Sequence, residues 1–225
     1  MSNIGKNVEK IKAQIAKGNV YGERVLLVAA TKMQTAQDIN QAIAAGVDAV
    51  AENKAQEFRD KYGEVDKCPR HFIGHLQTNK LKYIVGNVEL IHSCDREELL
   101  TEISKLSAKK EVVSNVLLQI NIGEEQSKGG YVYEQAQEVF IQARKTPNVC
   151  VKGFMAMLPD IDDETLLRAL VRKMRTLFEW AKTQSADVEY LSMGMSGDYM
   201  LCIEEGSNMI RVGSTIFGAR DYTNA

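Results

Sequence analysis

The residues best suited to chemistry lie in one C-terminal stretch, residues 190–218, where two loops each follow a short apolar run. Small and hydroxyl-bearing residues fill these loops: Gly194, Ser196, Gly197, Gly213, Ser214 and Thr215. Small residues let backbone N–H groups approach an anion, hydroxyls add donors, and a following helix directs its positive end toward the anion. Two such loops side by side predict one phosphate site, although each loop alone is also explained as a helix cap.

Two cationic residues could act beside such a phosphate. Lys32 follows the apolar run 24–30, and a partly desolvated lysine loses its proton readily enough to attack an aldehyde. Schiff-base chemistry is its natural use, and a solvated side chain is the alternative. Arg211 lies in the last apolar run, where a charge needs a partner, so we expect it to face either the ligand or a carboxylate such as Glu204.

These residues need a scaffold that brings the ends of several strands together. Eight short runs are predicted as strands, mostly without the alternation of a half-exposed sheet, and they centre on Val25, Val50, Phe72, Leu90, Leu117, Phe154, Leu191 and Ile210. Seven of the eight are followed by a clear helical pattern. Before the first strand, apolar residues at three- and four-residue intervals predict an additional amphipathic helix over residues 4–15, which we expect to act as a cover.

Eight successive β/α units predict an α/β fold, a (β/α)8 TIM barrel with an extra N-terminal helix, forming a single domain over residues 1–225. An open doubly wound sheet is the alternative, but it would usually carry a G-x-G-x-x-G turn after its first strand, and residues 28–34 have no such glycines. In a barrel, polar and other residues from every unit gather at one rim, namely Lys32, Asn53, His75, Ser93, Asn121, Met157, Ser196 and Ser214. Barrels of this type often hold a phosphate beside their last two strands, where the two loops lie.

Composition narrows the class of partner. The 28 basic and 30 acidic residues nearly cancel and are interspersed along the chain, which argues against a nucleic-acid surface and favours a small molecule. The first twenty residues contain no continuous apolar block, and no run approaches the roughly 20 residues of a membrane span, so we expect a cytoplasmic protein without a membrane partner. The four cysteines are widely spaced, which predicts buried thiols and neither a metal site nor a disulfide framework.

Several motifs together resemble a known family. They are TKM at 31–33, ENKAQE at 52–57, HFIGHLQTNK at 71–80, IHSCDR at 91–96, SKGGY at 127–131, SMGMSGD at 192–198 and GSNMIRVGSTIFGAR at 206–220. From Ile4 to Tyr222 the sequence resembles the pyridoxal phosphate homeostasis protein family. The resemblance implies a single-domain barrel related to the N-terminal domain of alanine racemase, which binds pyridoxal phosphate as its cofactor without robust catalytic activity.

The resemblance also implies roles for residues around the lysine and the phosphate. Lys32 looks like the lysine that forms the Schiff base. Ser196 and Ser214 look like phosphate ligands, and Gly213 and Thr215 are expected to supply backbone donors.

Further cofactor-binding residues follow from the same resemblance. Arg211 resembles the residue that faces the pyridine nitrogen, and Asn53 resembles the polar group beside the ring. Met193 is expected to pack near the cofactor, with a place in the core as the alternative. His75 lies where many relatives have proline, and its role stays open between the site and the capping of a loop.

The expected role is a carrier. A permanently charged donor facing the pyridine nitrogen keeps that nitrogen unprotonated and makes the ring a weaker electron sink. The related racemases also take a second acid/base from a C-terminal domain of a partner chain, and this sequence ends at Ala225, soon after the eighth strand. We therefore expect a monomer, not an enzyme, that holds pyridoxal phosphate as a Schiff base and passes it to apo-enzymes in vitamin B6 homeostasis. The alternatives are a weak pyridoxal-phosphate-dependent amino-acid racemase and a phosphosugar barrel with an aldolase-type Lys32.

Overall fold

The strands form a closed barrel in the computed structural model, which describes residues 2–61, 63–125 and 128–218. All pairings are parallel and the strands follow one another in sequence order: β1 Leu26–Ala30, β2 Ala49–Glu52, β3 Arg70–Phe72, β4 Leu90–Cys94, β5 Ser114–Ile120, β6 Val149–Ala156, β7 Tyr190–Ser192 and β8 Met209–Val212. β1 also pairs with β8, where Val28 lies opposite Arg211, and this pairing closes the barrel. The predicted (β/α)8 TIM barrel is confirmed, and the open doubly wound sheet is wrong.

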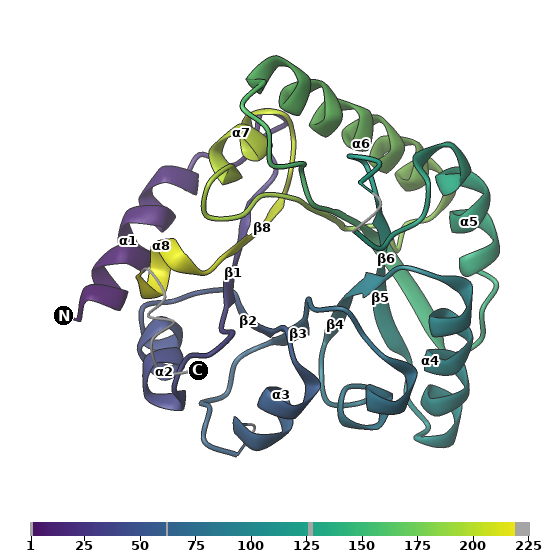
Figure 1. Cartoon of the computed structure of the whole chain (residues 1–225), viewed down its shortest axis with the longest axis horizontal. Helices are drawn as coiled ribbons and strands as arrows, with labels where there is room; N and C mark the ends of the chain where they lie inside the picture. The colour runs from purple at the N-terminus through teal and green to yellow at the C-terminus, as the bar shows by residue number, and fades with distance from the viewer. Residues whose placement is uncertain (1, 62, 126–127, 219–225) are drawn as a thin grey trace.

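Helices surround the strands as an outer ring (Figure 1). They are α1 Asn3–Ile15, α2 Ala36–Ala44, α3 Ala55–Lys61, α4 Glu97–Lys109, α5 Ala136–Ala143, α6 Glu164–Gln184, α7 Tyr199–Glu204 and α8 Ser214–Phe217, with 3-10 helices η1 Thr78–Tyr83 and η2 Tyr133–Gln135. The connection from β3 to β4 therefore holds η1 where we expected an α-helix. A turn follows η1, and Gly86 in that turn has a φ of 76°, a left-handed conformation that favours glycine.

The N-terminal helix α1 lies in the outer ring beside α2 and α8 (Figure 1). The side chain of Asn7 donates a hydrogen bond to the backbone oxygen of Ile216 in α8 at 2.9 Å, and the hydroxyl of Tyr199 in α7 donates to Gln14 at 2.7 Å. Its apolar face packs on β1, β8 and α2 through Val8, Ile11 and Ile15. The expected cover thus closes the side of the barrel next to the C-terminal loops, where the single turn of α8 leaves space.

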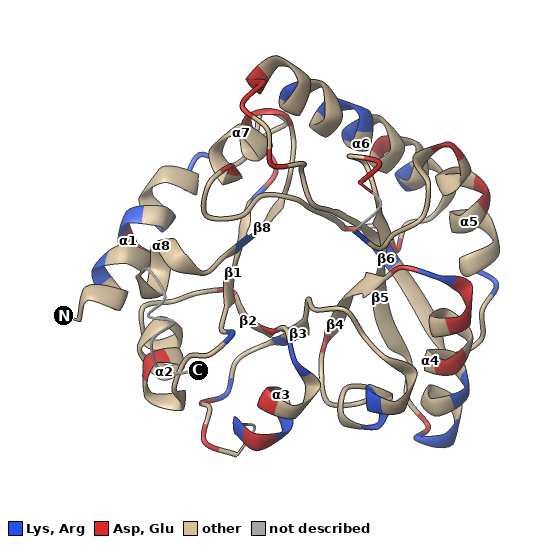
Figure 2. Cartoon of the chain, viewed as in Figure 1, with Lys and Arg blue, Asp and Glu red and all other residues tan. Residues whose placement is uncertain are grey.

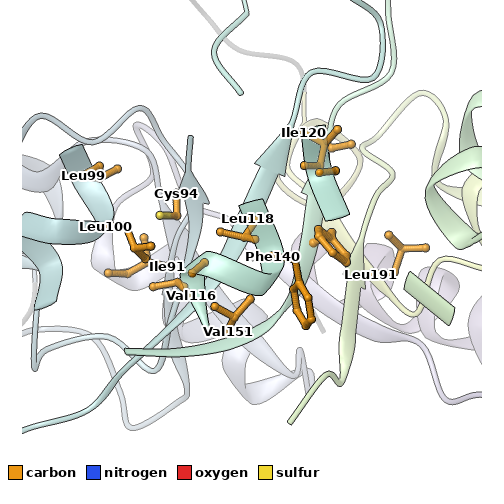
Figure 3. Close-up of a cluster of buried hydrophobic side chains, with 14 of the residues drawn as sticks. Ile91, Cys94, Leu99, Leu100, Val116, Leu118, Ile120, Phe140, Val151 and Leu191 are labelled. Carbon is orange, nitrogen blue, oxygen red and sulfur yellow. The ribbon is translucent and has the colours of Figure 1, made fainter. Parts of the chain in front are cut away.

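Apolar side chains fill two layers, one inside the barrel and one between the strands and the helices. The outer layer includes the cluster of buried side chains in Figure 3, with Phe140 among them. The ring centres of Phe140 and Phe154 lie 5.6 Å apart. Burying each such ring contributes about 1.5–3 kcal/mol. Charged residues lie mainly on the helices and loops outside these layers (Figure 2).

The barrel interior changes from apolar to polar toward the carboxyl ends of the strands. The apolar part consists of Val28, Ala49, Ala51, Leu90, Leu117, Met155 and Met209. Two residues further along three of these strands, and therefore on the same inward face, lie the buried His92 on β4, Gln119 on β5 and Arg211 on β8. Ser192 on β7, also buried, is two residues after Tyr190, which packs against the same apolar part. The fold thus concentrates its buried polar groups beneath the rim where the candidate residues lie.

Two further features bear on expectations from the sequence. Within the described residues no helix is long and apolar enough to cross a bilayer. All four cysteines are free, but only Cys94 and Cys202 are buried, while Cys68 and Cys150 are half-buried. The prediction of buried thiols is therefore right for two of the four.

Candidate functional site

Lys32 follows β1 at the carboxyl end of the barrel, where its side chain is half-buried. Within the part of the chain that the structure describes, its amine forms neither a hydrogen bond nor an ion pair. The neighbouring strand β8 leads into residues 213–215. Lys32 and the second Gly/Ser loop therefore follow adjacent strands, with the amine uncommitted.

The two Gly/Ser loops meet at the hydroxyl of Ser196. Its Oγ accepts hydrogen bonds from the backbone N–H groups of Gly213, at 3.2 Å, and of Thr215, at 3.3 Å. Two backbone N–H groups thus converge on one oxygen atom, which is the arrangement that binds an anion's oxygen. Ser214 lies between them with an exposed side chain. The structure therefore brings all four predicted phosphate-binding residues together.

Arg211 is buried on β8, with 4% of its surface exposed, and its partners carry no charge. Nη1 donates to the backbone oxygen of Ser192 at 2.8 Å and to its Oγ at 2.7 Å, and Nη2 donates to the backbone oxygen of Ala156 at 3.1 Å. Burial lowers the pKa of Arg211 to about 10. Of the two alternatives for Arg211, the ligand or a carboxylate such as Glu204, pairing with Glu204 is wrong, because Glu204 is exposed on α7 and pairs with Arg168 of α6 at 2.8 Å.

Two buried histidines extend the polar chain below Arg211. His92 Nδ1 lies 3.1 Å from Ser192 Oγ, and His92 Nε2 lies 3.0 Å from His71 Nδ1. Burial lowers the pKa of His71 to about 4; burial and the charges of His71 and Arg211 lower the pKa of His92 well below its usual value. Both imidazoles are therefore neutral near pH 7 and supply no negative charge to Arg211.

Sequence reasoning missed His71, His92 and Ser192. The only local signal was a polar side chain at the inward-facing position of an apolar strand, two residues after an apolar one, as with His92 after Leu90. That signal marks each residue singly. Their chain of contacts depends on the register of β3, β4, β7 and β8.

Asn53 and Met193 occupy different surroundings. Asn53 follows β2 with a half-buried side chain, and a Cβ added to Gly74 would lie 1.9 Å from its backbone oxygen, so the chain after β3 passes directly against it. Met193 is fully buried in the outer apolar layer, in the same cluster as Leu191 and Cys202. The structure brings Asn53 to the rim and does not bring Met193 to the polar groups there.

His75 takes part in a cluster over β3 and β4. Its Nδ1 lies 3.2 Å from Asp95 Oδ2, and Arg96 donates to the other oxygen of Asp95 at 2.5 Å and to the backbone oxygen of Leu76 at 3.1 Å. The imidazole itself is exposed, whereas the Asp95 carboxylate is 6% exposed. These contacts fasten the loop after β3 to the loop after β4, in line with a loop-capping histidine.

Three adjacent strands thus supply complementary groups. β7 and β8 present the N–H groups and hydroxyls around Ser196, β8 presents a buried guanidinium with N–H donors that its three bonds leave unused, and β1 presents the amine of Lys32. A ligand that suits this set carries an anionic group, an acceptor atom and an electrophilic carbon.

Known sequences are similar to the chain along its whole length. The family model described as "Alanine racemase, N-terminal domain" matches residues 1–221. A protein of Aquifex aeolicus named "Pyridoxal phosphate homeostasis protein" is 36% identical over 225 residues, covering 99% of this chain and 97% of the relative. The protein of the same name in Escherichia coli strain K12 is 32% identical, with 98% and 97% covered.

Solved structures share the barrel. PipY of Synechococcus elongatus PCC7942, solved with pyridoxal phosphate bound, is 27% identical and has a TM-score of 0.83, covering 96% of this chain and 100% of PipY. An alanine racemase of Clostridium difficile 630 is 16% identical, with a TM-score of 0.76, and the match covers 99% of this chain and 58% of the racemase. The likeness to the racemase concerns the fold alone.

Proposed function

Because the chain belongs to the pyridoxal phosphate homeostasis protein family, within the alanine racemase N-terminal domain family, we propose that it binds pyridoxal phosphate at the carboxyl rim of its barrel. It holds the cofactor through a Schiff base with Lys32 and serves in pyridoxal phosphate homeostasis. The observation that carries this proposal is the convergence of the Gly213 and Thr215 N–H groups, which follow β8, on the oxygen of Ser196; β8 lies next to β1, which Lys32 follows.

The phosphate end of the site is assigned to the two C-terminal loops. The Gly213 and Thr215 N–H groups already share one hydroxyl oxygen, so a phosphate oxygen needs the same donors and no new backbone arrangement. Ser196 and Ser214 add hydroxyl donors. Neutral donors suffice for a phosphate that lies at a solvent-accessible rim, where water shares its remaining charge.

At the reactive end, pyridoxal phosphate supplies an aldehyde that condenses with an amine and a ring that can withdraw electrons. Lys32 provides the amine, which no described residue engages in an ion pair. Asn53, at the end of the next strand, is assigned to the edge of the ring.

Arg211 is assigned to the ring nitrogen, and this assignment favours holding the cofactor over catalysis. The guanidinium donates hydrogen bonds and accepts none. Any atom that it faces stays unprotonated, so the ring remains a weak electron sink. Ser192, His92 and His71 below Arg211 are neutral and do not act as acids that protonate the ring nitrogen. Amino-acid turnover at ordinary enzymatic rates is therefore not expected.

Borohydride reduction tests the covalent link. The purified protein is loaded with pyridoxal phosphate, reduced and mapped by peptide mass spectrometry; the adduct is expected on Lys32, and Lys32→Ala is expected to lose the visible absorption band. Lys54→Ala, which removes an exposed lysine after the next strand, is the matched control and keeps the band. An unmodified Lys32 peptide, or a band that survives Lys32→Ala, contradicts the proposal.

Two further measurements separate the phosphate site and the racemase alternative. Ser196→Ala is expected to weaken binding of pyridoxal phosphate by roughly tenfold while leaving the weaker binding of unphosphorylated pyridoxal unchanged; an equal loss for both ligands argues against a phosphate role. Incubation with L-alanine followed by chiral analysis is expected to show no enzymatic turnover, and rapid D-alanine formation supports the racemase instead.

The role is assigned to one domain over residues 1–225 that acts as a monomer and passes the cofactor to apo-enzymes. Light scattering of the purified protein, with and without pyridoxal phosphate, tests the monomer: a mass near 25.1 kDa is expected in both states.

A further inference from the structure

A cluster of charged side chains behind the first two strands has no part in the proposed site. Glu52 ends β2, and Glu57 and Lys61 lie on α3. The Lys61 amine lies 3.2 Å from Glu52 Oε1 and 3.1 Å from Glu57 Oε2. The cluster is shielded, because the Glu52 side chain is 7% exposed and those of Glu57 and Lys61 are 21% and 22% exposed.

Both carboxylates reach the backbone segment that carries Lys32. The hydroxyl of Thr31 donates to Glu52 Oε1 at 2.7 Å, and the backbone N–H of Met33 donates to Glu57 Oε2 at 2.9 Å. The residue before Lys32 and the residue after it are therefore each fixed to one carboxylate of the cluster, and Lys61 joins the two carboxylates.

Met33 shows that this attachment holds the chain in a conformation it would not choose alone. Its φ is 63°, in the left-handed region that non-glycine residues seldom occupy. A strained residue persists only where surrounding contacts determine it. Here the determining contact is the charge-assisted hydrogen bond from the Met33 N–H to Glu57.

Lys61 is the cation that lies between the Glu52 and Glu57 carboxylates. Burial raises the pKa of Glu52, and the charge of Lys61 offsets this only in part. Burial also raises the pKa of Glu57, but the hydrogen bonds from Met33 and Lys61 outweigh it and bring the pKa below its usual value. Lys61 thus pairs with one oxygen of each carboxylate, while the buried Glu52 Oε2 has no hydrogen-bond partner among the described residues.

We propose that Glu52, Glu57 and Lys61 form a positioning site for Lys32, one that holds Thr31 and Met33, the residues on either side of it. The inference rests on the assignment of Lys32 as the lysine that holds the cofactor. The cluster itself is no ligand site: the cavity beside Glu52, also lined by Thr31, Phe58 and Lys61, has a volume of about 20 Å³, enough for one water molecule.

The test measures the reactivity of Lys32 in the protein without cofactor. Trace labelling with acetic anhydride at about pH 8, read lysine by lysine by mass spectrometry, reports how often each amine is unprotonated and accessible. In Lys61→Met the two carboxylates lose the amine that joins them, so Glu52 and Glu57 hold Thr31 and Met33 less firmly, and the labelling rate of Lys32 is expected to change roughly threefold or more. Lys61→Arg, which restores a cation, is expected to return the rate most of the way to the wild-type value.

Lys54→Met is the matched control, because Lys54 contacts Glu57 at 3.7 Å from the same part of the chain but is 61% exposed and does not touch Glu52. It is expected to leave Lys32 labelling within about twofold of the wild-type rate. A Lys61→Met protein that unfolds at the wild-type temperature and labels Lys32 at the wild-type rate overturns the proposal.

A second variant keeps the test decisive if Lys61→Met does not fold. Glu57→Gln retains the side-chain shape and removes the charge that holds Met33, so hydrogen exchange at the Met33 amide is expected to accelerate roughly tenfold. Unchanged exchange at Met33 overturns the proposal. Since neither measurement uses pyridoxal phosphate, failure of this inference and failure of the proposed function give different results.

Discussion

Two arginines of this barrel are almost fully buried, and their surroundings are opposite. Arg175 on α6 is 3% exposed and donates to the Glu23 carboxylate at 2.5 and 3.0 Å, pairs with Glu179, and stacks 3.8 Å from the ring centre of Tyr21. Arg211 on β8 is 4% exposed and bonds to carbonyl and hydroxyl oxygens alone. Among the described residues, Arg175 thus has two carboxylate counterions and Arg211 has none.

The pKa shifts express that difference. Burial lowers the pKa of Arg175, but its hydrogen bonds and charge interactions with Glu23 outweigh burial, so the pKa rises. Burial of Arg211 is not offset in this way, and its pKa falls to about 10. An arginine that fastens elements together is best paired with carboxylates, whereas one that serves a ligand keeps its charge and some of its donors uncommitted.

The largest effect expected from this comparison is on Arg175. Arg175→Met leaves Lys182 as the remaining cation beside Glu23 and Glu179 and removes the Arg175 hydrogen bonds to these carboxylates and to the Gly206 oxygen. The expected loss is about 3 kcal/mol of unfolding free energy, since one hydrogen bond to a charged group contributes about 1.5–3 kcal/mol. Urea unfolding measures this loss. The control is Arg172→Met on the same helix, where a 63% exposed arginine pairs with Glu205 and a loss below about 1 kcal/mol is expected. Equal losses of unfolding free energy for the two variants would contradict the distinction between the buried Arg175 and the exposed Arg172.

Acid destabilisation tests the neutral histidines below Arg211. The pKa of His71 is lowered to about 4, so between about pH 6.5 and 4 the unfolded chain binds a proton that the folded chain refuses. The unfolding free energy therefore falls as the pH falls through this range, by roughly 2 kcal/mol between about pH 7 and 5 from His71 alone. His71→Asn is expected to remove that part of the slope, and His75→Asn, at an exposed histidine, is expected to retain it.

Ser192→Ala interrupts the chain between Arg211 and His92. The variant removes an acceptor for the guanidinium and the partner of His92 Nδ1, and a loss of about 1.5 kcal/mol is expected, the cost of a hydrogen bond to a charged group. Urea unfolding gives the loss, and nitrogen NMR of the imidazoles reports a changed tautomer or environment at His92. An unaltered His92 spectrum would show that the serine does not connect the two.

The smallest effect on stability is expected at Arg211 itself. Arg211→Met loses three hydrogen bonds to neutral acceptors and also removes a buried cation without a counterion, so the unfolding free energy changes by only about 1 kcal/mol in either direction. The same variant is expected to alter the absorption spectrum of bound pyridoxal phosphate, because the group assigned to the ring nitrogen is gone. A stability loss as large as that of Arg175→Met, with an unchanged spectrum, would reverse the two assignments.

Local patterns in the sequence predicted the barrel and much of the rim. Apolar runs without alternation marked the strands, and the Gly/Ser loops after the last two strands contain the residues that meet at Ser196. The partners of Arg211 could not be predicted, because Ser192 and Ala156 come from two other strands, β7 and β6, and their contacts with Arg211 follow from strand register. Glu204 was a wrong partner because it faces outward from α7 toward Arg168.

Met193 illustrates the same limit on a smaller scale. It follows Ser192 immediately, and successive residues of a strand point to opposite faces, so an inward Ser192 sends Met193 into the outer apolar layer. The motif at residues 192–198 contains both Ser192 and Met193 and does not indicate which of the two side chains faces inward. The cluster of Glu52, Glu57 and Lys61 could not be predicted for a different reason. Charged residues on a short helix are ordinarily solvated, and this group differs because the Glu52 side chain is buried.

The contact between Asn7 and Ile216 joins residues 209 positions apart in the chain, and its consequence concerns biosynthesis. β1 cannot pair with β8, and α1 cannot pack against α8, until residues 209–217 have left the ribosome. Contacts of such long sequence separation form late and slowly. The nascent chain is therefore expected to bring its two Gly/Ser loops together late in folding, after residues 209–218 have been synthesised.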